Sequence, residues 1–162
     1  MHSAVIKPMI RPIALTDLDH LLEIEEQSFP KSPYSLTTFV HLFWLYPETF
    51  WVYVDQSRGQ EKEETCAYLI FSREGHLISL AVHPNYRRRR IAETLVRKAM
   101  ETLPVKRMRA EVRRSNRGAR AFYQRLGFQI AGVLSNYYGN EDALIVEIHA
   151  GSSVSGGKGS SE

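Results

Sequence analysis

A nearly continuous apolar run, residues 76–82, is followed within a few positions by four consecutive arginines, Arg87 to Arg90. A short apolar run without alternation is typical of a strand that is buried on both faces. Beyond the arginines, apolar side chains recur at helical spacing from Ile91 to Leu103, which predicts an amphipathic helix. We therefore expect a buried strand that leads into a helix through a short basic turn.

The basic turn lies where the predicted helix begins. The first backbone N–H groups of a helix have no partner inside the helix, and the helix dipole adds partial positive charge there. A turn of this kind is a ready site for phosphate groups. We therefore expect a phosphorylated cofactor on Arg87 to Glu93, with a solvated basic loop as the alternative.

Basic charge is concentrated in one quarter of the chain. Residues 87–125 contain 14 lysines and arginines against 3 acidic residues, whereas residues 1–86 contain 6 against 11. The net charge of +3 for the whole chain hides this asymmetry. The asymmetry implies an anionic partner, and charge alone admits both nucleic acid and a multiply phosphorylated cofactor.

The periodicity of the chain predicts a mixed α/β fold. A length of 162 residues, of which 43% are hydrophobic, fits one domain with a sizeable core. We expect the order β-α-α-β-β-β-α-β-α-β-β in a single, mostly antiparallel sheet, with parallel pairing where a helix connects the fourth and fifth strands. We expect this domain in residues 1–150, followed by a disordered Gly/Ser-rich tail in residues 151–162.

Two details of the N-terminal half follow from local patterns. Pro8 interrupts the first predicted strand, which favours an edge position because proline cannot donate a ladder hydrogen bond. Ser35 can cap the second predicted helix. Phe39 and Trp44 belong to an apolar stripe of that helix, which we expect to face the core.

Several features restrict the class of protein. Cys66 is the single cysteine, so no intrachain disulfide can form, and its apolar neighbours favour a core position over a nucleophilic one. No apolar run approaches the ~20 residues needed to cross a bilayer, and the N-terminus lacks the features of a signal peptide. The histidines are scattered and form no metal-binding motif. We expect a cytoplasmic protein with no metal site and no membrane segment.

Glu111 is a carboxylate on the polar face of a predicted strand that begins at Arg107. A carboxylate in such a place either forms a structural ion pair, here with Arg109 or Arg113, or acts as a base. Tyr123 follows on the next predicted helix, where a tyrosine is usually a core residue with a satisfied hydroxyl. The residues themselves leave these readings open.

Three stretches, taken together and in this order, resemble the GNAT N-acetyltransferase superfamily. The segments GHLISLAVHPNYRRRRIAETLVRKAM and EVRRSNRGARAFYQRLGF resemble its motifs A and B. The segment NYYGNEDALIVEI resembles the closing segment of its protein N-terminal, or RimI-like, branch. The resemblance covers residues 75–149 strongly, and FPKSPYS resembles the loop between the first two helices of that branch. It implies a GNAT-type domain whose fourth and fifth strands run parallel and splay apart.

The resemblance also implies an activity and a set of site residues. The activity is direct transfer of the acetyl group of acetyl-CoA to the N-terminal α-amine of a protein, with a ribosomal protein among the candidate substrates. Glu111 would be the general base and Tyr123 the general acid. The implied cofactor contacts are Leu80, Ala81, Val82, Arg87, Arg88, Arg89, Arg90, Ile91, Ala92, Glu93 and Asn116. The implied walls of the peptide groove are Phe29, Tyr34, Tyr137 and Tyr138.

One position departs from the family pattern. Arg90 stands where the cofactor signature of the family has a glycine, which permits close backbone approach and unusual φ angles. We expect cofactor binding to be retained, because Ala92 and the amides at the helix start remain. The alternatives are a GNAT enzyme that acetylates lysine side chains or a small amine, and a non-catalytic basic module that binds nucleic acid. We expect a monomer or weak oligomer that meets nucleic acid only through a ribosome.

Overall fold

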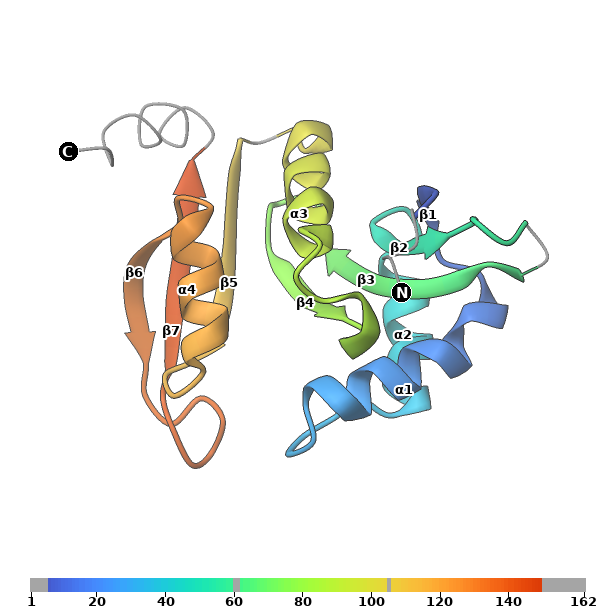
Figure 1. Cartoon of the computed structure of the whole chain (residues 1–162). Coiled ribbons are helices and arrows are strands. Elements are labelled where there is room, and N and C mark those ends of the chain that lie inside the picture. The colour runs from blue at the N-terminus through green and yellow to red at the C-terminus, as the bar shows by residue number, and fades with distance from the viewer. Residues whose placement is uncertain (1–5, 60–61, 105, 150–162) are drawn as a thin grey trace. The chain divides into compact units, whose positions relative to one another are not determined.

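The computed structural model describes residues 6–59, 62–104 and 106–149 (Figure 1). The predicted tail, residues 151–162, lies outside this described part. By its internal contacts the chain divides into two compact units. The first comprises Met1–Ser72 with Ile78–Lys98, and the second comprises Arg73–Leu77 with Ala99–Glu162.

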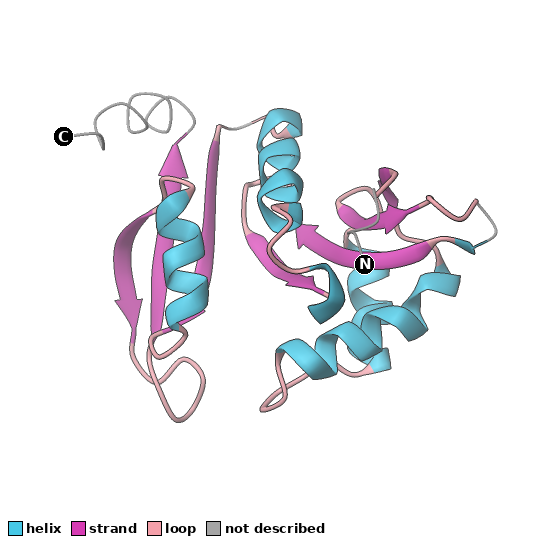
Figure 2. Ribbon diagram, viewed as in Figure 1, coloured by secondary structure: helices cyan, strands magenta, loops and turns pink. Residues whose placement is uncertain are grey.

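The helices and strands follow one another in the predicted order (Figure 2). They are β1 (Pro8–Pro12), the 3-10 helix η1 (Leu15–Asp17), α1 (Leu18–Ser28), α2 (Leu36–Leu45), β2 (Phe50–Asp55), β3 (Glu64–Phe71), β4 (Leu77–Val82), the 3-10 helix η3 (Pro84–Tyr86), α3 (Ile91–Thr102), β5 (Arg107–Arg113), α4 (Arg117–Arg125), β6 (Gln129–Leu134) and β7 (Ala143–His149). The predicted mixed α/β class is confirmed.

The first unit contains a four-stranded sheet in the order β1-β2-β3-β4. Strand β1 pairs antiparallel with β2 and lies at one end of the sheet, so the edge position predicted from Pro8 is confirmed. Side chains from α1, α2 and the sheet form its core, with Leu21, Phe39, Phe50 and Tyr68 fully buried. This core fixes α1 and α2 against the sheet that ends in β4.

Helix α2 begins as predicted but buries only part of its apolar surface. The Ser35 hydroxyl accepts a hydrogen bond from the Thr38 N–H at 3.2 Å, which caps the helix. Phe39 is fully buried, whereas Trp44 is 76% exposed, so the prediction that Trp44 faces the core is wrong. The helix is apolar around most of its circumference, and a single core can cover only one side of it.

The second unit contains a three-stranded antiparallel sheet in the order β5-β7-β6. In the β5–β7 pair, Glu111 lies opposite Ile145 and Arg109 lies opposite Glu147. Met108, which alternates with these polar residues along β5, is fully buried. The period of two that was read from the sequence is therefore the observed division between the core face and the polar face of β5.

The described strands form two hydrogen-bonded sheets where a single sheet was expected, and β4 and β5 lie in different sheets. One isolated parallel bridge joins His76, which immediately precedes β4, to Arg109 on β5. A helical connection predicts that two strands run parallel, but it does not fix how many ladder bonds they form. Within the described residues, no helix is both long enough and apolar enough to span a bilayer.

Candidate active site

Strand β4 carries the first group of predicted cofactor contacts. It is an end strand of its sheet, with β3 as its neighbour. Ala81 is buried, whereas Leu80 and Val82 are half-buried. The Val82 carbonyl accepts a hydrogen bond from the Arg87 Nε at 3.1 Å. An end strand can receive an extended ligand along its outer edge, as in β-strand addition, although Arg87 already engages one of its carbonyl groups.

The arginine turn has a backbone that normally requires glycine. Arg88 and Arg90 have φ angles of 66° and 60°, both in the left-handed region that L-residues with a side chain rarely adopt. The Arg90 carbonyl accepts hydrogen bonds from the N–H of Thr94 at 3.0 Å and from its hydroxyl at 2.8 Å. Helix α3 begins at the next residue. Arg90 therefore adopts a backbone geometry that is usual for glycine.

The side chains of the arginine turn are all exposed. Arg87 extends back to the Ser28 hydroxyl, at 3.4 Å. The guanidinium carbon of Arg89 lies 5.3 Å from the centre of the Tyr86 ring. Exposed guanidinium groups beside the first amides of a 12-residue helix fit the phosphate groups of a nucleotide cofactor.

The second unit brings Glu111 together with a histidine. The Glu111 carboxylate contacts His76 Nε2 at 2.8 Å and Arg109 NH1 at 3.0 Å, and its side chain is only 12% exposed. The hydrogen bond to His76 and the nearby charges hold the pKa of Glu111 below its ordinary value, against the raising effect of burial. Of the two ion-pair partners considered for Glu111, Arg109 is observed, whereas Arg113 pairs with Glu141 at 3.1 Å.

His76 is a site residue that the sequence patterns did not predict. The residue occupies this place because the turn before β4 approaches β5 closely. The Gly75 carbonyl accepts the Arg109 N–H at 2.8 Å, and a Cβ at Gly75 would lie 2.0 Å from the Arg107 carbonyl oxygen. The parallel pairing predicted for β4 and β5 was the signal that could have located His76 beside the polar face of β5.

Tyr123, the predicted acid, is buried in the second unit. It is 7% exposed and packs edge-on against Phe122 and Phe128, with ring centres 5.0 Å away in each case. Burial raises the pKa of its phenol well above the ordinary value, and the charges of Tyr138 and Glu111 raise it further. The Tyr123 hydroxyl therefore keeps its proton throughout the neutral range.

The loop between β6 and β7 holds the two predicted groove tyrosines. Tyr137 is 52% exposed and packs at a right angle to Tyr138, with ring centres 5.0 Å apart. The guanidinium of Arg113 lies 4.1 Å from the centre of the Tyr138 ring. Glu141 accepts hydrogen bonds from the Ser115 N–H and hydroxyl, both at 3.0 Å. These contacts fasten the loop to the end of β5.

The remaining predicted residues have defined local partners. The side-chain carbonyl of Asn116 caps α4 by accepting the Ala119 N–H at 3.0 Å, so this oxygen is already engaged. In the first unit, Phe29 and Tyr34 pack against the hydrophobic core. The first unit thus carries these two aromatic residues, the β4 edge and the arginine turn. The second unit carries Asn116, the loop tyrosines and the group of Glu111, His76 and Tyr123.

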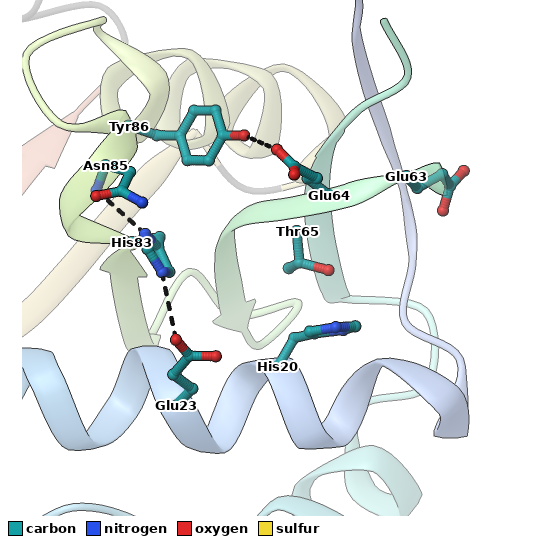
Figure 3. A pocket seen from close by; sticks show the side chains of 8 residues that line it. All are labelled: His20, Glu23, Glu63, Glu64, Thr65, His83, Asn85 and Tyr86. Carbon is teal, nitrogen blue, oxygen red and sulfur yellow. Dashed lines mark hydrogen bonds and ion pairs between the residues drawn. The ribbon is translucent and has the colours of Figure 1, made fainter. Parts of the chain in front are cut away.

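A separate polar pocket of about 210 Å³ lies in the first unit (Figure 3). Glu23 on α1 lies 3.6 Å from His83 Nε2, and the Tyr86 hydroxyl donates to Glu64. The lining residues are His20, Glu23, Glu63, Glu64, Thr65, His83, Asn85 and Tyr86. Three carboxylates make this pocket unsuitable for a phosphate group, so it is distinct from the anion site expected at the arginine turn.

Comparisons with known proteins agree on one family. The family model described as "Acetyltransferase (GNAT) family" matches residues 18–128. The "Putative [ribosomal protein bS18]-alanine N-acetyltransferase" of Bacillus subtilis is 33% identical over 145 residues, which cover 86% of this chain and 94% of that protein. The "[Ribosomal protein bS18]-alanine N-acetyltransferase" of Salmonella typhimurium is 38% identical over 82 residues, covering 46% of this chain and 55% of that protein.

Solved structures show the same similarity. Ard1 from Thermoplasma volcanium has a TM-score of 0.75 at 24% identity, covering 89% of this chain and 98% of that chain. The ribosomal-protein-S18-alanine N-acetyltransferase from Escherichia coli has a TM-score of 0.69 at 25% identity, covering 88% of this chain and 94% of that chain. The similarity therefore extends across both units of the fold.

Proposed function

Because this chain belongs to the GNAT acetyltransferase family, we propose that it transfers the acetyl group of acetyl-CoA to the N-terminal α-amine of a protein. The relative from Bacillus subtilis, which aligns with most of both chains, is named for acetylation of an alanine of ribosomal protein bS18. We extend that class of substrate to this chain, namely a protein N-terminus with a small first residue. A ribosomal protein of this kind would be acetylated in the cytoplasm.

Acetyl-CoA is the acetyl donor in this family and supplies an activated thioester. The outer edge of β4 at Leu80, Ala81 and Val82 suits the extended part of this molecule. The amides at the start of α3 and the guanidinium groups of the arginine turn suit its pyrophosphate. Support for this fit comes from Arg90, whose φ of 60° lies in the left-handed region that glycine adopts without strain. Asn116 is a further proposed contact of acetyl-CoA.

Glu111 and His76 form the proposed proton-accepting pair, and their 2.8 Å contact is the observation that carries the mechanism. An α-amine must be neutral to attack a thioester, and its ordinary pKa is about 7.7–8.0. Glu111 stays ionised because its pKa is lowered, so it can hold an ammonium group or a positively charged imidazole. The His76 ring lies against the Glu111 carboxylate, so an imidazole that accepted the amine proton would be held beside a negative charge.

Tyr123 is the proposed proton donor on the other side of the reaction. The raised pKa keeps its hydroxyl protonated at neutral pH, so the hydroxyl can donate a hydrogen bond to a departing thiolate. The buried edge-on contacts with Phe122 and Phe128 fix the direction of the ring. With these two proton-transfer groups, a direct transfer requires no covalent intermediate on the enzyme.

We also propose that residues 1–150 act as one catalytic domain. The alignment with the Bacillus subtilis relative supports this view, because it covers 94% of that protein. Membership of an acetyltransferase family favours an enzyme over the non-catalytic nucleic-acid module. Acetylation of lysine side chains or of small amines is the competing activity within the family.

A peptide assay separates these activities. Purified protein is incubated with acetyl-CoA and a peptide that begins with alanine and contains one internal lysine. Mass spectrometry then locates the acetyl group, and the control is the same peptide with a blocked N-terminus. We expect acetylation of the α-amine of the first peptide and none of the control. Acetylation of the internal lysine in both peptides would contradict the proposal.

A further inference from the structure

Glu25 is a buried carboxylate that the proposed chemistry does not use. It lies on α1, is only 2% exposed, and accepts hydrogen bonds from two different parts of the first unit. One oxygen accepts the Tyr68 hydroxyl of β3, and the other accepts the Tyr34 N–H at 2.9 Å. Burial of a carboxylate is costly unless strong hydrogen bonds compensate it, so these two contacts define its position.

The same network continues to the strand that carries the cofactor contacts. The Tyr68 hydroxyl lies 2.8 Å from the Ser79 Oγ, and both groups are buried. Ser79 immediately precedes Leu80 on β4. A single buried chain of hydrogen bonds therefore connects β4, through Tyr68 and Glu25, to the backbone of Tyr34 in the loop between α1 and α2.

Aromatic packing supports the same loop from the other side. Tyr34 packs edge-on against Phe39, with ring centres 5.6 Å apart and an interplanar angle of 85°. Phe39 packs edge-on against Tyr68 at the same distance, with an angle of 88°. The loop thus has one polar and one apolar attachment, and both lead to Tyr68. Two prolines, Pro30 and Pro33, further restrict the loop backbone.

We propose that Glu25 is a positioning residue that holds the loop of residues 29–35 in the conformation that receives the protein N-terminus. This inference rests on the proposed function, because Phe29 and Tyr34 are its proposed groove residues. Glu25 acts through the Tyr34 backbone and takes no part in proton transfer. Removal of the Glu25 carboxylate should therefore raise the Michaelis constant for the peptide more than that for acetyl-CoA.

The test compares Glu25→Met, Glu25→Gln and the control Glu26→Gln, whose side chain is exposed on the same helix. Steady-state kinetics with the alanine peptide give separate Michaelis constants for peptide and acetyl-CoA. For Glu25→Met we expect a peptide Michaelis constant about tenfold higher, the size expected for one hydrogen bond to a charged group. We expect an acetyl-CoA constant within about twofold of wild type, because the acetyl-CoA contacts do not include Glu25.

Glu25→Gln tests whether a neutral side chain that can form the same hydrogen bonds restores peptide binding. A glutamine can accept the Tyr34 N–H with its oxygen and donate to the Tyr68 hydroxyl, which can still donate to Ser79. We expect this variant to keep most of the wild-type peptide constant, and Glu26→Gln to keep all of it. Loss of activity in Glu25→Gln equal to that in Glu25→Met would show that the charge itself matters and would overturn the positioning role.

Hydrogen–deuterium exchange supplies a readout that needs no turnover. Exchange in residues 29–35 should become faster in Glu25→Met, and also in Tyr68→Phe, which serves if Glu25→Met does not fold. Unchanged exchange and an unchanged peptide constant in folded variants would overturn the inference while leaving the proposed function intact. If wild type acetylated no peptide α-amine, the proposed function would fail, and the inferred substrate role of the loop would fail with it.

Discussion

Arg90 has a backbone conformation that is usual for glycine, although it carries a long side chain. Its φ of 60° is the conformation for which glycine is normally selected, because a Cβ is strained there. The strain is local, since the Arg90 side chain is exposed and its carbonyl receives two hydrogen bonds from Thr94. The consequence is a turn with glycine-like geometry and an additional positive charge.

This strain can be measured by comparing two substitutions at one position. Arg90→Gly and Arg90→Ala both remove the charge, but only glycine relieves the left-handed backbone. We expect the glycine variant to be more stable by about 1 kcal/mol in denaturant unfolding. At Lys98, within α3, the order should reverse by about the same amount, because glycine is unfavourable in a helix. The same order of stability at both positions would exclude backbone strain at Arg90.

The contact between Glu111 and His76 predicts that the two residues act as one unit. Glu111→Gln and His76→Gln should each lower kcat by roughly 10²-fold, the usual contribution of a positioned acid–base group. The double variant should be no slower than the more impaired single variant, because removing either partner disables the pair. Effects of the two substitutions that multiply in the double variant would show that the residues act independently.

At the scale of secondary-structure elements, each unit has one group of close contacts that joins elements distant in the sequence. The turn that ends at Gly75 delivers His76 to β5 in the second unit, with the Gly75 carbonyl bound to the Arg109 N–H. In the first unit, Arg11 of β1 bridges Asp17 of η1 and Glu63, each at 2.8 Å. Both groups depend on close contacts between elements, so both are sensitive to single substitutions.

Gly75→Ala should disrupt the approach of the turn to β5. An added Cβ would lie 2.0 Å from the Arg107 carbonyl oxygen, and the φ of 93° is itself unfavourable for alanine. We expect a loss of roughly 2–4 kcal/mol of unfolding free energy, in the range of severe backbone effects. Gly59→Ala is the matched control, because Gly59 has a similar φ of 96° with nothing within 4 Å of the added Cβ. Equal losses of unfolding free energy at the two positions would show that the positive φ alone causes the effect.

The ion pairs of Arg11 should make stability depend on acid pH. Burial alone would raise the pKa of Asp17, but hydrogen bonds from Arg11 and the Ala14 N–H lower it below its ordinary value of 3.8. Because the folded pKa is lowered, the folded state binds fewer protons than the unfolded state in this range. The contribution of Asp17 is therefore complete above the unfolded pKa and is lost as the pH falls through the folded pKa.

Arg11→Met should test this linkage. We expect a loss of about 1–3 kcal/mol at pH 7, because a buried carboxylate loses a charged hydrogen-bond donor. Denaturant unfolding should also show a smaller fall in stability than wild type from pH 5 to about pH 3. Arg58→Met, at an exposed ion pair with Glu64, should change stability by less than about 0.5 kcal/mol. A wild-type slope retained in Arg11→Met would contradict the assignment.

At the scale of the whole molecule, the basic segment, residues 87–125, is divided between the two units. Residues 87–98 belong to the first unit, whereas the rest of the segment, from Ala99 onward, belongs to the second. Charge alone could not distinguish nucleic acid from a phosphorylated cofactor, since both are anionic. The choice came from the match to the acetyltransferase family over residues 18–128.

Much of the fold was predictable because it depends on local patterns. Apolar side chains recur with a period of 2 in strands and 3.6 in helices. The order of strands and helices along the chain could therefore be predicted from these periods. The cap at Ser35 and the edge position of β1 also followed from local chemistry. The exposure of Trp44 could not be predicted, because an apolar helix surface does not reveal which of its sides the core will cover.

The sequence by itself determined the order of elements and the strand–turn–helix that suits a phosphate group, whereas Glu111 and Tyr123 became candidates through the resemblance to a family. Only the tertiary structure decided that His76 contacts Glu111, that Arg90 adopts a glycine-like backbone, and that Glu25 joins α1 to the Tyr34 loop. The physical reason is range. Periodicity and caps act between near neighbours, whereas the contact of His76 with Glu111 joins residues 35 positions apart and depends on the packing of separate elements.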